Sequence, residues 1–121
     1  MPKTILIVED DLKNMSLITD LLQAHGYATL QSVDGKDIFE LAREHHPDLI
    51  LMDIRLPDVS GIDHTKALKA DEALKDIPVV AVTAFAMKAD EEKIRAAGCD
   101  GYIIKPINIP LLLENIAKYL V

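Results

Sequence analysis

The chain is poor in cysteine, in aromatic residues and in basic residues. It has one cysteine, no tryptophan, and 13 Lys and Arg against 20 Asp and Glu, which gives a net charge of −7. The lone Cys99 excludes an internal disulfide, so nothing in the chain requires an oxidising compartment. Nucleic-acid backbones and anionic membranes attract basic surfaces, and the acidic excess therefore argues against direct binding to either.

The N-terminal region also lacks a long apolar run. Only four consecutive apolar residues, Ile5 to Val8, follow the first four residues, too few for the core of a signal peptide or for a membrane-spanning helix. At 121 residues, half of them apolar, the chain is long enough to form one domain with a substantial core. We therefore predict a single domain, residues 1–121, that is soluble and cytoplasmic.

Five short runs rich in β-branched and other apolar residues are typical of strands covered by helices on both faces. Apolar residues at helical spacing occupy the intervals between them. This alternation favours an α/β fold: a five-stranded parallel sheet, in the order 2-1-3-4-5 counted along the chain, flanked by five helices. The strands are expected at residues 4–9, 27–32, 49–53, 79–83 and 101–105.

The five expected helices differ in their apolar content. The first ends near Gly26, a residue suited to a helix C-terminus, and the second follows Asp34. The third spans residues 62–70, and the fifth follows Asn108, a good N-cap. The fourth, residues 88–97, is mostly charged and offers few large apolar side chains to a core. Because few buried contacts mean low local stability, we expect this helix to be the most mobile of the five.

Carboxylates follow the first and third expected strands, as Glu9-Asp10-Asp11 and Asp53. The carboxyl ends of neighbouring parallel strands meet at one edge of the sheet. Like charges about 4 Å apart repel by about 4 kcal/mol at an effective dielectric of about 20, so such a cluster is costly unless a cation shares it. Oxygen ligands suit Mg²⁺ better than Zn²⁺. The pattern predicts a divalent metal site that includes Asp10, whereas Asp11 is more typical of a helix N-cap.

A hydroxyl group and an ammonium group follow the fourth and fifth expected strands, as Thr83 and Lys105. Taken singly, Thr83 is typical of an ordinary strand and Lys105 of a protein surface. Together with the acids they favour a phosphoryl-binding site, because an ammonium and a hydroxyl group can both bind phosphoryl oxygens. The isomer of the Lys105-Pro106 bond stays open, since most bonds before proline are trans.

One joint motif consists of Glu9-Asp10, Asp53, Thr83-Ala84, Tyr102 and Lys105-Pro106. It resembles the signature of the receiver domain of two-component response regulators. The resemblance covers essentially the whole chain, and the joint motif is far more specific than any of its members. It implies the CheY-like, flavodoxin-like fold. Within the family, residues 6–10, 48–53 and 78–88 resemble single-domain regulators of cell division and cell fate in particular.

The resemblance implies the chemistry of the site. Asp53 would accept a phosphoryl group from the phosphohistidine of a kinase or a phosphotransferase. Asp10, Asp53 and the backbone carbonyl of Arg55 would bind Mg²⁺, or Mn²⁺ in its place, with Glu9 acting through water. Arg55 and Phe85 would flank the phosphoryl group and affect the access of water to it.

The resemblance also implies a switch and its partners. Lys105 would pair with the phosphoryl group, while Thr83 would move to hydrogen-bond it and draw Tyr102 inward. Such a change would bias a two-state equilibrium in the second half of the chain. Histidine kinases or phosphotransferases would dock at the first helix. Downstream proteins would bind the helix expected at residues 88–97, the strand at 101–105 and the helix after Asn108.

Three other functions fit the residues less well. A phosphatase of the haloacid dehalogenase type needs an acid two residues after its nucleophile, where this chain has Arg55. A flavodoxin-like FMN binder needs a hydroxyl- and glycine-rich loop where this chain has the acids at 9–11. A receiver acting only as a non-phosphorylated scaffold would have no need of the full set of site residues. We therefore expect a phosphoryl acceptor rather than an enzyme, with at most self-phosphorylation from small donors and autodephosphorylation.

Overall fold

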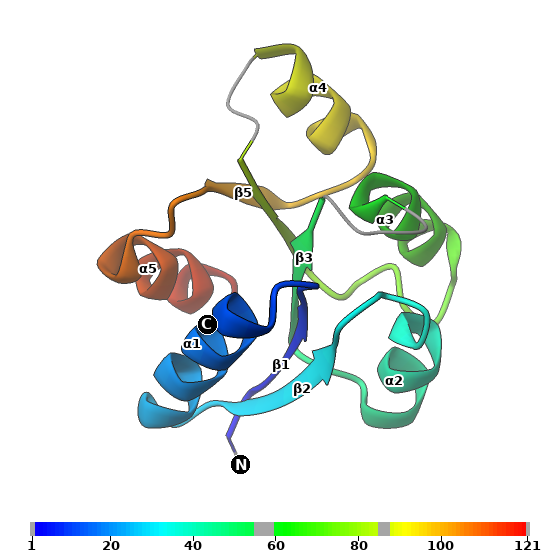
Figure 1. The fold of residues 1–121 in the computed structure, drawn as a ribbon. Coiled ribbons are helices and arrows are strands. Elements are labelled where there is room, and N and C mark those ends of the chain that lie inside the picture. Colours follow the sequence, from blue (N-terminus) through cyan, green and yellow to red (C-terminus); the bar gives the residue numbers. More distant parts are fainter. Residues whose placement is uncertain (1, 55–59, 85–87, 121) are drawn as a thin grey trace.

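The computed structural model describes residues 2–54, 60–84 and 88–120, in which strands and helices alternate (Figure 1). This alternation confirms the predicted α/β class. No helix in these ranges is long and apolar enough to cross a membrane. The strands are β1 (Thr4–Val8), β2 (Ala28–Ser32), β3 (Leu49–Asp53), β4 (Val79–Thr83) and β5 (Gly101–Ile104), and the helices are α1 (Leu12–Ala24), α2 (Ile38–His45), α3 (Gly61–Ala70), α4 (Lys88–Ala96) and α5 (Ile109–Tyr119).

The strands form one parallel sheet in the order β2-β1-β3-β4-β5, as predicted. Asp53 pairs in register with Val82, next to Thr83 at the end of β4. The strands β1 and β5 are each one residue shorter than expected, so Glu9 and Lys105 directly follow their strands. The carboxyl ends of β1, β3, β4 and β5 therefore bring the predicted site residues to one edge of the sheet.

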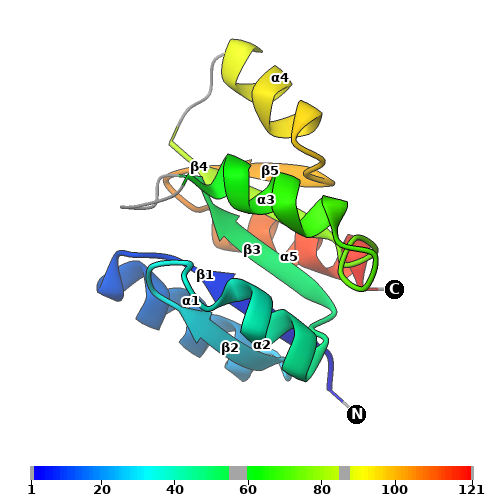
Figure 2. The same cartoon turned by 90° about the vertical axis from the view of Figure 1, so that its right-hand side faces the viewer.

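Two layers of helices cover the sheet. In Figure 2, α2 and α3 lie in front of the sheet, with α1 and α5 behind it. Alternate residues of β1 face the two layers: Leu6 and Val8 pack with buried side chains of α2, α3 and α4, while Ile5 and Ile7 pack with those of α1 and α5. Both faces of β1, β3 and β4 are thus buried, which explains why these strands are mainly apolar runs without polar alternation, whereas the edge strand β2 is only partly buried.

The ends of α1 and α5 carry the predicted capping residues. The Asp11 side chain accepts hydrogen bonds at the start of α1, including one from the Lys13 N–H at 2.9 Å, which confirms its capping role. The Asn108 side chain accepts one from the Leu111 N–H at 3.1 Å. Gly26 adopts a φ of +88° just after α1, a conformation that favours glycine and ends the helix.

Helix α2 follows Asp34, as expected, and begins at Ile38. The intervening residues form a turn in which Gly35 has a φ of +80° and donates its N–H to Ser32 Oγ at 3.1 Å. Asp34 accepts a hydrogen bond from the Lys36 N–H within this turn. Asp34 therefore belongs to the turn that leads into the helix.

Candidate functional site

Three carboxylates gather at the carboxyl ends of β1 and β3. One oxygen atom from each of Glu9, Asp10 and Asp53 lies within 4.8 Å of the others, which confirms that these side chains converge. Glu9 and Asp53 are only 2% and 3% exposed, whereas Asp10 is exposed. Protein therefore encloses Glu9 and Asp53, while solvent can reach the group at Asp10.

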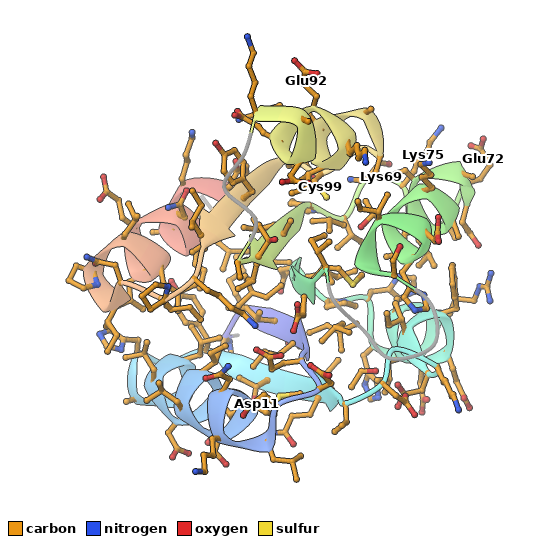
Figure 3. The ribbon with its side chains drawn as sticks, turned by 45° about the horizontal axis from the view of Figure 1, so that its top comes forward. Asp11, Lys69, Glu72, Lys75, Glu92 and Cys99 are labelled. Atoms are coloured by element: carbon orange, nitrogen blue, oxygen red, sulfur yellow. The ribbon has the colours of Figure 1, made fainter. Side chains whose placement is uncertain are left out.

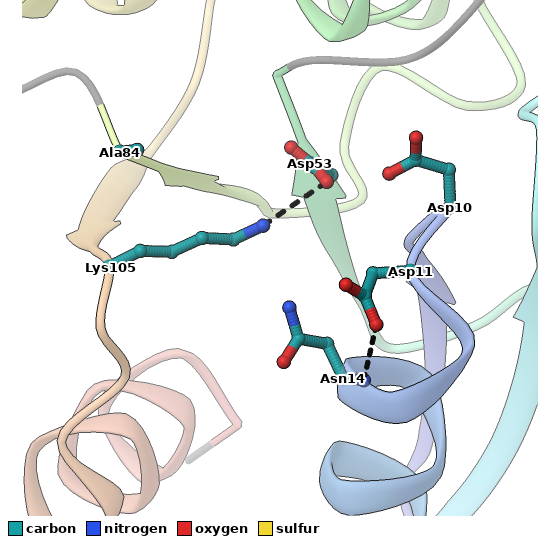
Figure 4. A pocket seen from close by; sticks show the side chains of 6 residues that line it. All are labelled: Asp10, Asp11, Asn14, Asp53, Ala84 and Lys105. Carbon is teal, nitrogen blue, oxygen red and sulfur yellow. Dashed lines mark hydrogen bonds and ion pairs between the residues drawn. The ribbon is translucent and has the colours of Figure 1, made fainter.

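Lys105 connects two of these carboxylates. Its Nζ donates hydrogen bonds to Glu9 Oε1 at 3.1 Å and to Asp53 Oδ2 at 3.3 Å, and Figure 4 shows the contact with Asp53. The backbone N–H of Lys105 donates to the carbonyl of Thr83 at 2.7 Å, so the lysine is held beside the end of β4. The Lys105-Pro106 bond is cis. The ammonium group thus lies between the two buried acids.

The electrostatics of Glu9 show that negative charge is crowded here. Burial, a hydrogen bond with Asp53 and the charge of Asp53 raise the pKa of Glu9 from 4.5 to about 7, against the opposing effect of Lys105. For Lys105, burial favours the neutral amine, but the charges of Asp53 and Glu9 outweigh it and raise the pKa of the amine above its ordinary value. The lysine is therefore charged at neutral pH, and its single positive charge does not balance the acids.

A cleft of about 420 Å³ opens at this group. Figure 4 shows Asp10, Asp53 and Lys105 extending toward one another across it. Asp11 lies on the α1 side of the cleft. Its carboxylate caps the N-terminus of α1 and accepts a hydrogen bond from the Asn14 N–H at 3.1 Å. The cleft can admit a small anionic ligand and an ion next to the Asp53 carboxylate. Its lining residues are Asp10, Asp11, Asn14, Asp53, Ala84 and Lys105.

Thr83 and Tyr102 lie on the half of the sheet formed by β4 and β5. Thr83 is fully buried at the end of β4, and Ala84 lines the cleft. Tyr102 pairs in register with Ala81, two residues before Thr83, and its partly buried ring packs against the core cluster that includes Ile94 of α4. The structure therefore places Thr83 at the strand-end edge and Tyr102 between that edge and α4.

Two further predicted positions, Arg55 and Phe85, lie outside the described residues. Their expected effects on the phosphoryl group stay predictions.

The sequence reading missed two supports of the site. Ser32, at the end of β2, is buried; its carbonyl accepts the Glu9 N–H at 3.1 Å and its hydroxyl donates to Asp37 Oδ1. Gly61, the first residue of α3, lies directly against the backbone of Asp53. The Asp-Gly turn after Ser32 was a usable signal for the first support. Nothing in the local sequence shows which strand Gly61 contacts, because that depends on the tertiary fold.

The donor set fits a hard divalent cation. Glu9, Asp10 and Asp53 supply only carboxylate oxygens, and carboxylates with room for water are typical of Mg²⁺ sites. The pKa of Glu9 is raised first by burial and then by Asp53, and a cation bound here would favour the ionised carboxylate instead. No histidine or cysteine belongs to the group, so its chemistry does not match a zinc site.

Comparisons with known sequences agree on one family. Residues 5–117 match the family described as the response regulator receiver domain. The chain is 58% identical over 120 residues to the polar-differentiation response regulator DivK of Brucella ovis, with 99% of this chain and 98% of that protein covered. The same identity and coverage hold for the protein of that name from Brucella anthropi.

Solved structures share the fold. The receiver domain of the sensor histidine kinase PA1611 from Pseudomonas aeruginosa, described with a magnesium ion coordinated in its active-site cleft, matches with a TM-score of 0.91 and 32% identity, covering 99% of this chain and 98% of that one. The chemotaxis protein CheY4 of Vibrio cholerae matches with a TM-score of 0.93 and 24% identity, covering 99% and 100%, which supports the fold alone.

Proposed function

This chain belongs to the response regulator receiver domain family, and on that premise we propose that it is a phosphorylation-dependent signalling switch that accepts a phosphoryl group on Asp53. One observation carries the proposal: the buried Asp53 carboxylate faces a solvent-accessible cleft between two other acids and one ammonium group. An isolated structural acid needs only one partner, whereas this arrangement surrounds a carboxylate with groups that bind phosphoryl oxygens and metal ions.

The proposed step is a displacement at phosphorus. A carboxylate oxygen of Asp53 attacks the phosphorus atom of a phosphohistidine, a P–O bond forms, and the P–N bond breaks with its electron pair going to the imidazole. The other ring nitrogen carries a proton, so the products are an acyl phosphate on Asp53 and a neutral imidazole on the donor. Small donors such as acetyl phosphate would react in the same way, and attack by water would later release inorganic phosphate.

We propose that Asp10, Asp53 and the backbone carbonyl of Arg55 hold Mg²⁺, with Glu9 acting through water and Mn²⁺ able to substitute. When bound, the ion neutralises charge shared between the carboxylates and the phosphoryl oxygens. Asp10 supports this assignment because it is the exposed member of the group, open to an ion that arrives from solvent.

Lys105 and Thr83 would bind the transferred group. The Lys105 ammonium already lies 3.3 Å from Asp53 Oδ2, so it needs little movement to reach an oxygen of a phosphoryl group attached there. The Thr83 hydroxyl would move to hydrogen-bond another oxygen. Movement of Thr83 would leave space on the face where Tyr102 lies, and Tyr102 would turn inward. Phosphorylation would thereby be converted into a change at β4, α4 and β5.

The donor would dock beside the cleft, at α1 and the segment after β5. A second cleft, of about 500 Å³, borders the first and includes the exposed Leu17 and the residues Pro106 and Ile107. An apolar surface next to the acceptor would hold a kinase or phosphotransferase helix while its phosphohistidine reaches Asp53. The output surface would be α4, β5 and α5, where Ile104, Ile109 and Leu111 are exposed.

We propose a role in cell division or polar differentiation, regulated through downstream proteins. The support is the 58% identity to the DivK proteins named above, over nearly the full length of both chains. Histidine kinases or phosphotransferases would supply the phosphoryl group in the cytoplasm.

Phosphate-affinity electrophoresis after incubation with acetyl phosphate and Mg²⁺ tests the proposal. The wild-type protein and an Asp20→Asn control, altered at an exposed position on α1, should each give one shifted band. Asp53→Asn should give none. Labelling of Asp53→Asn at the wild-type level would show that another residue is the acceptor. No shift in any variant, with Mg²⁺ present, would favour a scaffold function instead.

A further inference from the structure

The first residue of α3 lies against the backbone of the proposed acceptor. A Cβ atom placed on Gly61 would stand 2.3 Å from the carbonyl oxygen of Asp53 and 2.8 Å from the Cα atom of Ile54. Carbon atoms in contact normally stay about 3.5–4 Å apart, so α3 and the end of β3 are closer than any side chain at position 61 would permit. Both obstructing groups are backbone, which cannot turn aside as a flexible side chain can.

Hydrogen bonds hold both sides of this contact. The Gly61 N–H donates to the carbonyl of Ile54 at 3.0 Å, and the buried Thr65 hydroxyl donates to the carbonyl of Gly61 at 2.7 Å. On the strand side, the Ile54 N–H donates to the carbonyl of Val82 at 3.2 Å. Helix α3 is also anchored by the fully buried Leu68. An added side chain at position 61 would therefore push on two segments that are each held in place.

We infer that Gly61 is a positioning residue for phosphoryl transfer: its lack of a side chain lets α3 seat the Asp53–Ile54 peptide where the Asp53 carboxylate can share a metal ion with Asp10. The inference rests on the proposed function of Asp53 and concerns what sets its position. Gly61 touches no ligand itself. It acts through the backbone that carries Asp53 and continues toward the proposed carbonyl ligand at Arg55.

The expected consequence of a substitution is a displaced acceptor. In Gly61→Ala, β3 and α3 must separate by roughly 1 Å, and Asp53 moves relative to Glu9 and Asp10, which directly follow β1. Displacements of about this size at a reacting group cost up to about a hundredfold in rate. We expect the Mg²⁺ dissociation constant to rise at least about tenfold, and the phosphorylation rate at saturating Mg²⁺ to fall as well.

Gly98→Ala provides a matched control, because it is also a glycine-to-alanine change that destabilises the fold. Gly98 has a φ of +105°, which alanine rarely adopts, and its added Cβ would meet the flexible side chain of Lys69 at 2.8 Å. It follows α4 at the opposite end of β5 from Lys105. We expect Gly98→Ala to lower the thermal midpoint while its Mg²⁺ affinity stays within about twofold of wild type.

The experiment is an Mg²⁺ titration followed by amide NMR, with thermal unfolding and acetyl phosphate labelling measured on the same samples. Weaker Mg²⁺ binding in Gly61→Ala but not in Gly98→Ala supports the inference. Wild-type binding in Gly61→Ala, or equal weakening in both variants, overturns it. If wild type itself fails to bind Mg²⁺ or to be labelled, the proposed function fails, which is seen without either variant.

A second pair of variants covers the case in which Gly61→Ala does not fold. Thr65→Val removes the hydrogen bond to the Gly61 carbonyl and keeps the side-chain volume, while Thr19→Val removes the hydroxyl that accepts from Gln31 Nε2 on the other face of the sheet. We expect Thr65→Val to weaken Mg²⁺ binding about twofold or more, and Thr19→Val to leave it unchanged. Equal Mg²⁺ affinity in these two variants also overturns the inference.

Discussion

Helices α4 and α5 both follow strands that end at the site, yet they are held to the protein very differently. Helix α5 follows Lys105 and buries Leu112 and Ile116 completely. Helix α4 follows the end of β4, and Ile94 is the one buried side chain among its described residues. Burying a large aliphatic side chain contributes about 1.5–3 kcal/mol, so α5 is the more firmly anchored helix.

The site residues divide between the same two regions. Within β3, Asp53 follows Leu49 and Leu51 at steps of two, and those residues face the core shared with α1 and α5. Within β4, Thr83 follows Val79 and Ala81, which face the core shared with α3 and α4. The proposed acceptor thus lies on the face packed against α1 and α5, and the threonine lies on the face that includes the sparsely buried α4.

The largest effect should come from Lys105, the cation that precedes the well-anchored α5. Lys105→Ala should still bind Mg²⁺, because the three carboxylates remain, but beryllofluoride or phosphorylation should no longer change the amide spectrum of α4. Lys66→Ala, at an exposed position on α3, should respond as wild type does. The measurement is an NMR comparison with and without beryllofluoride. A normal α4 response in Lys105→Ala would show that the lysine is a surface residue without a role in signalling.

The anchoring of α5 predicts the next largest effect. Leu112→Ala should lower the free energy of unfolding by about 2–5 kcal/mol, because a fully buried leucine leaves a cavity. Its neighbour Leu111 is 48% exposed, and Leu111→Ala should change stability by less than about 1 kcal/mol. Urea denaturation followed by circular dichroism compares the two. Equal losses of unfolding free energy in the two variants would mean that the buried Leu112 does not anchor α5.

The pKa of Glu9 predicts how the acidic group responds to pH. Because this pKa is raised from 4.5 to about 7, the folded protein holds the proton more tightly than the unfolded chain. Its contribution to stability, up to about 3 kcal/mol, is complete below about pH 4.5 and is lost as pH rises through about 7. Mg²⁺ should restore stability most at the upper end of this window, because it binds the ionised acids.

The control for this prediction is Glu9→Gln, which removes the titration and should flatten the profile. His64 acts in the opposite direction, since burial lowers its pKa and favours the folded state as pH rises. The difference between wild type and Glu9→Gln is therefore the quantity to measure, as thermal midpoints between pH 5 and 8, with and without Mg²⁺. A difference that does not change with pH would contradict the shift at Glu9.

The smallest effect concerns the contact that joins α4 to β5. The guanidinium of Arg95 lies 5.3 Å from the ring centre of Tyr102 and pairs with Glu91 on the same helix at 3.1 Å. An exposed cation–π contact of this kind favours the present orientation of Tyr102 by about two- to fivefold in population. Arg95→Gln should therefore tighten apparent beryllofluoride affinity by up to that factor. Lys93→Gln serves as the charge-matched control. Equal beryllofluoride affinities in the two variants would show that the contact between Arg95 and Tyr102 does not favour either orientation of Tyr102.

Much of the fold could be predicted because its signals are local. Apolar runs of strand length and helical stripes located the ten elements of the described residues, and Asp11 and Asn108 were recognisable as caps. The turn between Ser32 and α2 was not recognised, because its polar residues are also typical of a helix start. The members of the acidic group were also predictable, since strand order brings the ends of β1 and β3 together.

The sequence by itself determined the class of fold and which acids follow the strands, because alternation and hydrophobic period are local signals, and the known strand order of this kind of fold then places those acids at one sheet edge. Only the tertiary structure decided that Lys105 bridges Glu9 and Asp53, that burial and Asp53 raise the pKa of Glu9, and that Gly61 lies against the backbone of Asp53. These features depend on distances of a few ångströms between segments far apart in the chain. Contacts on that scale are set by how the layers pack, which no local pattern of residues encodes.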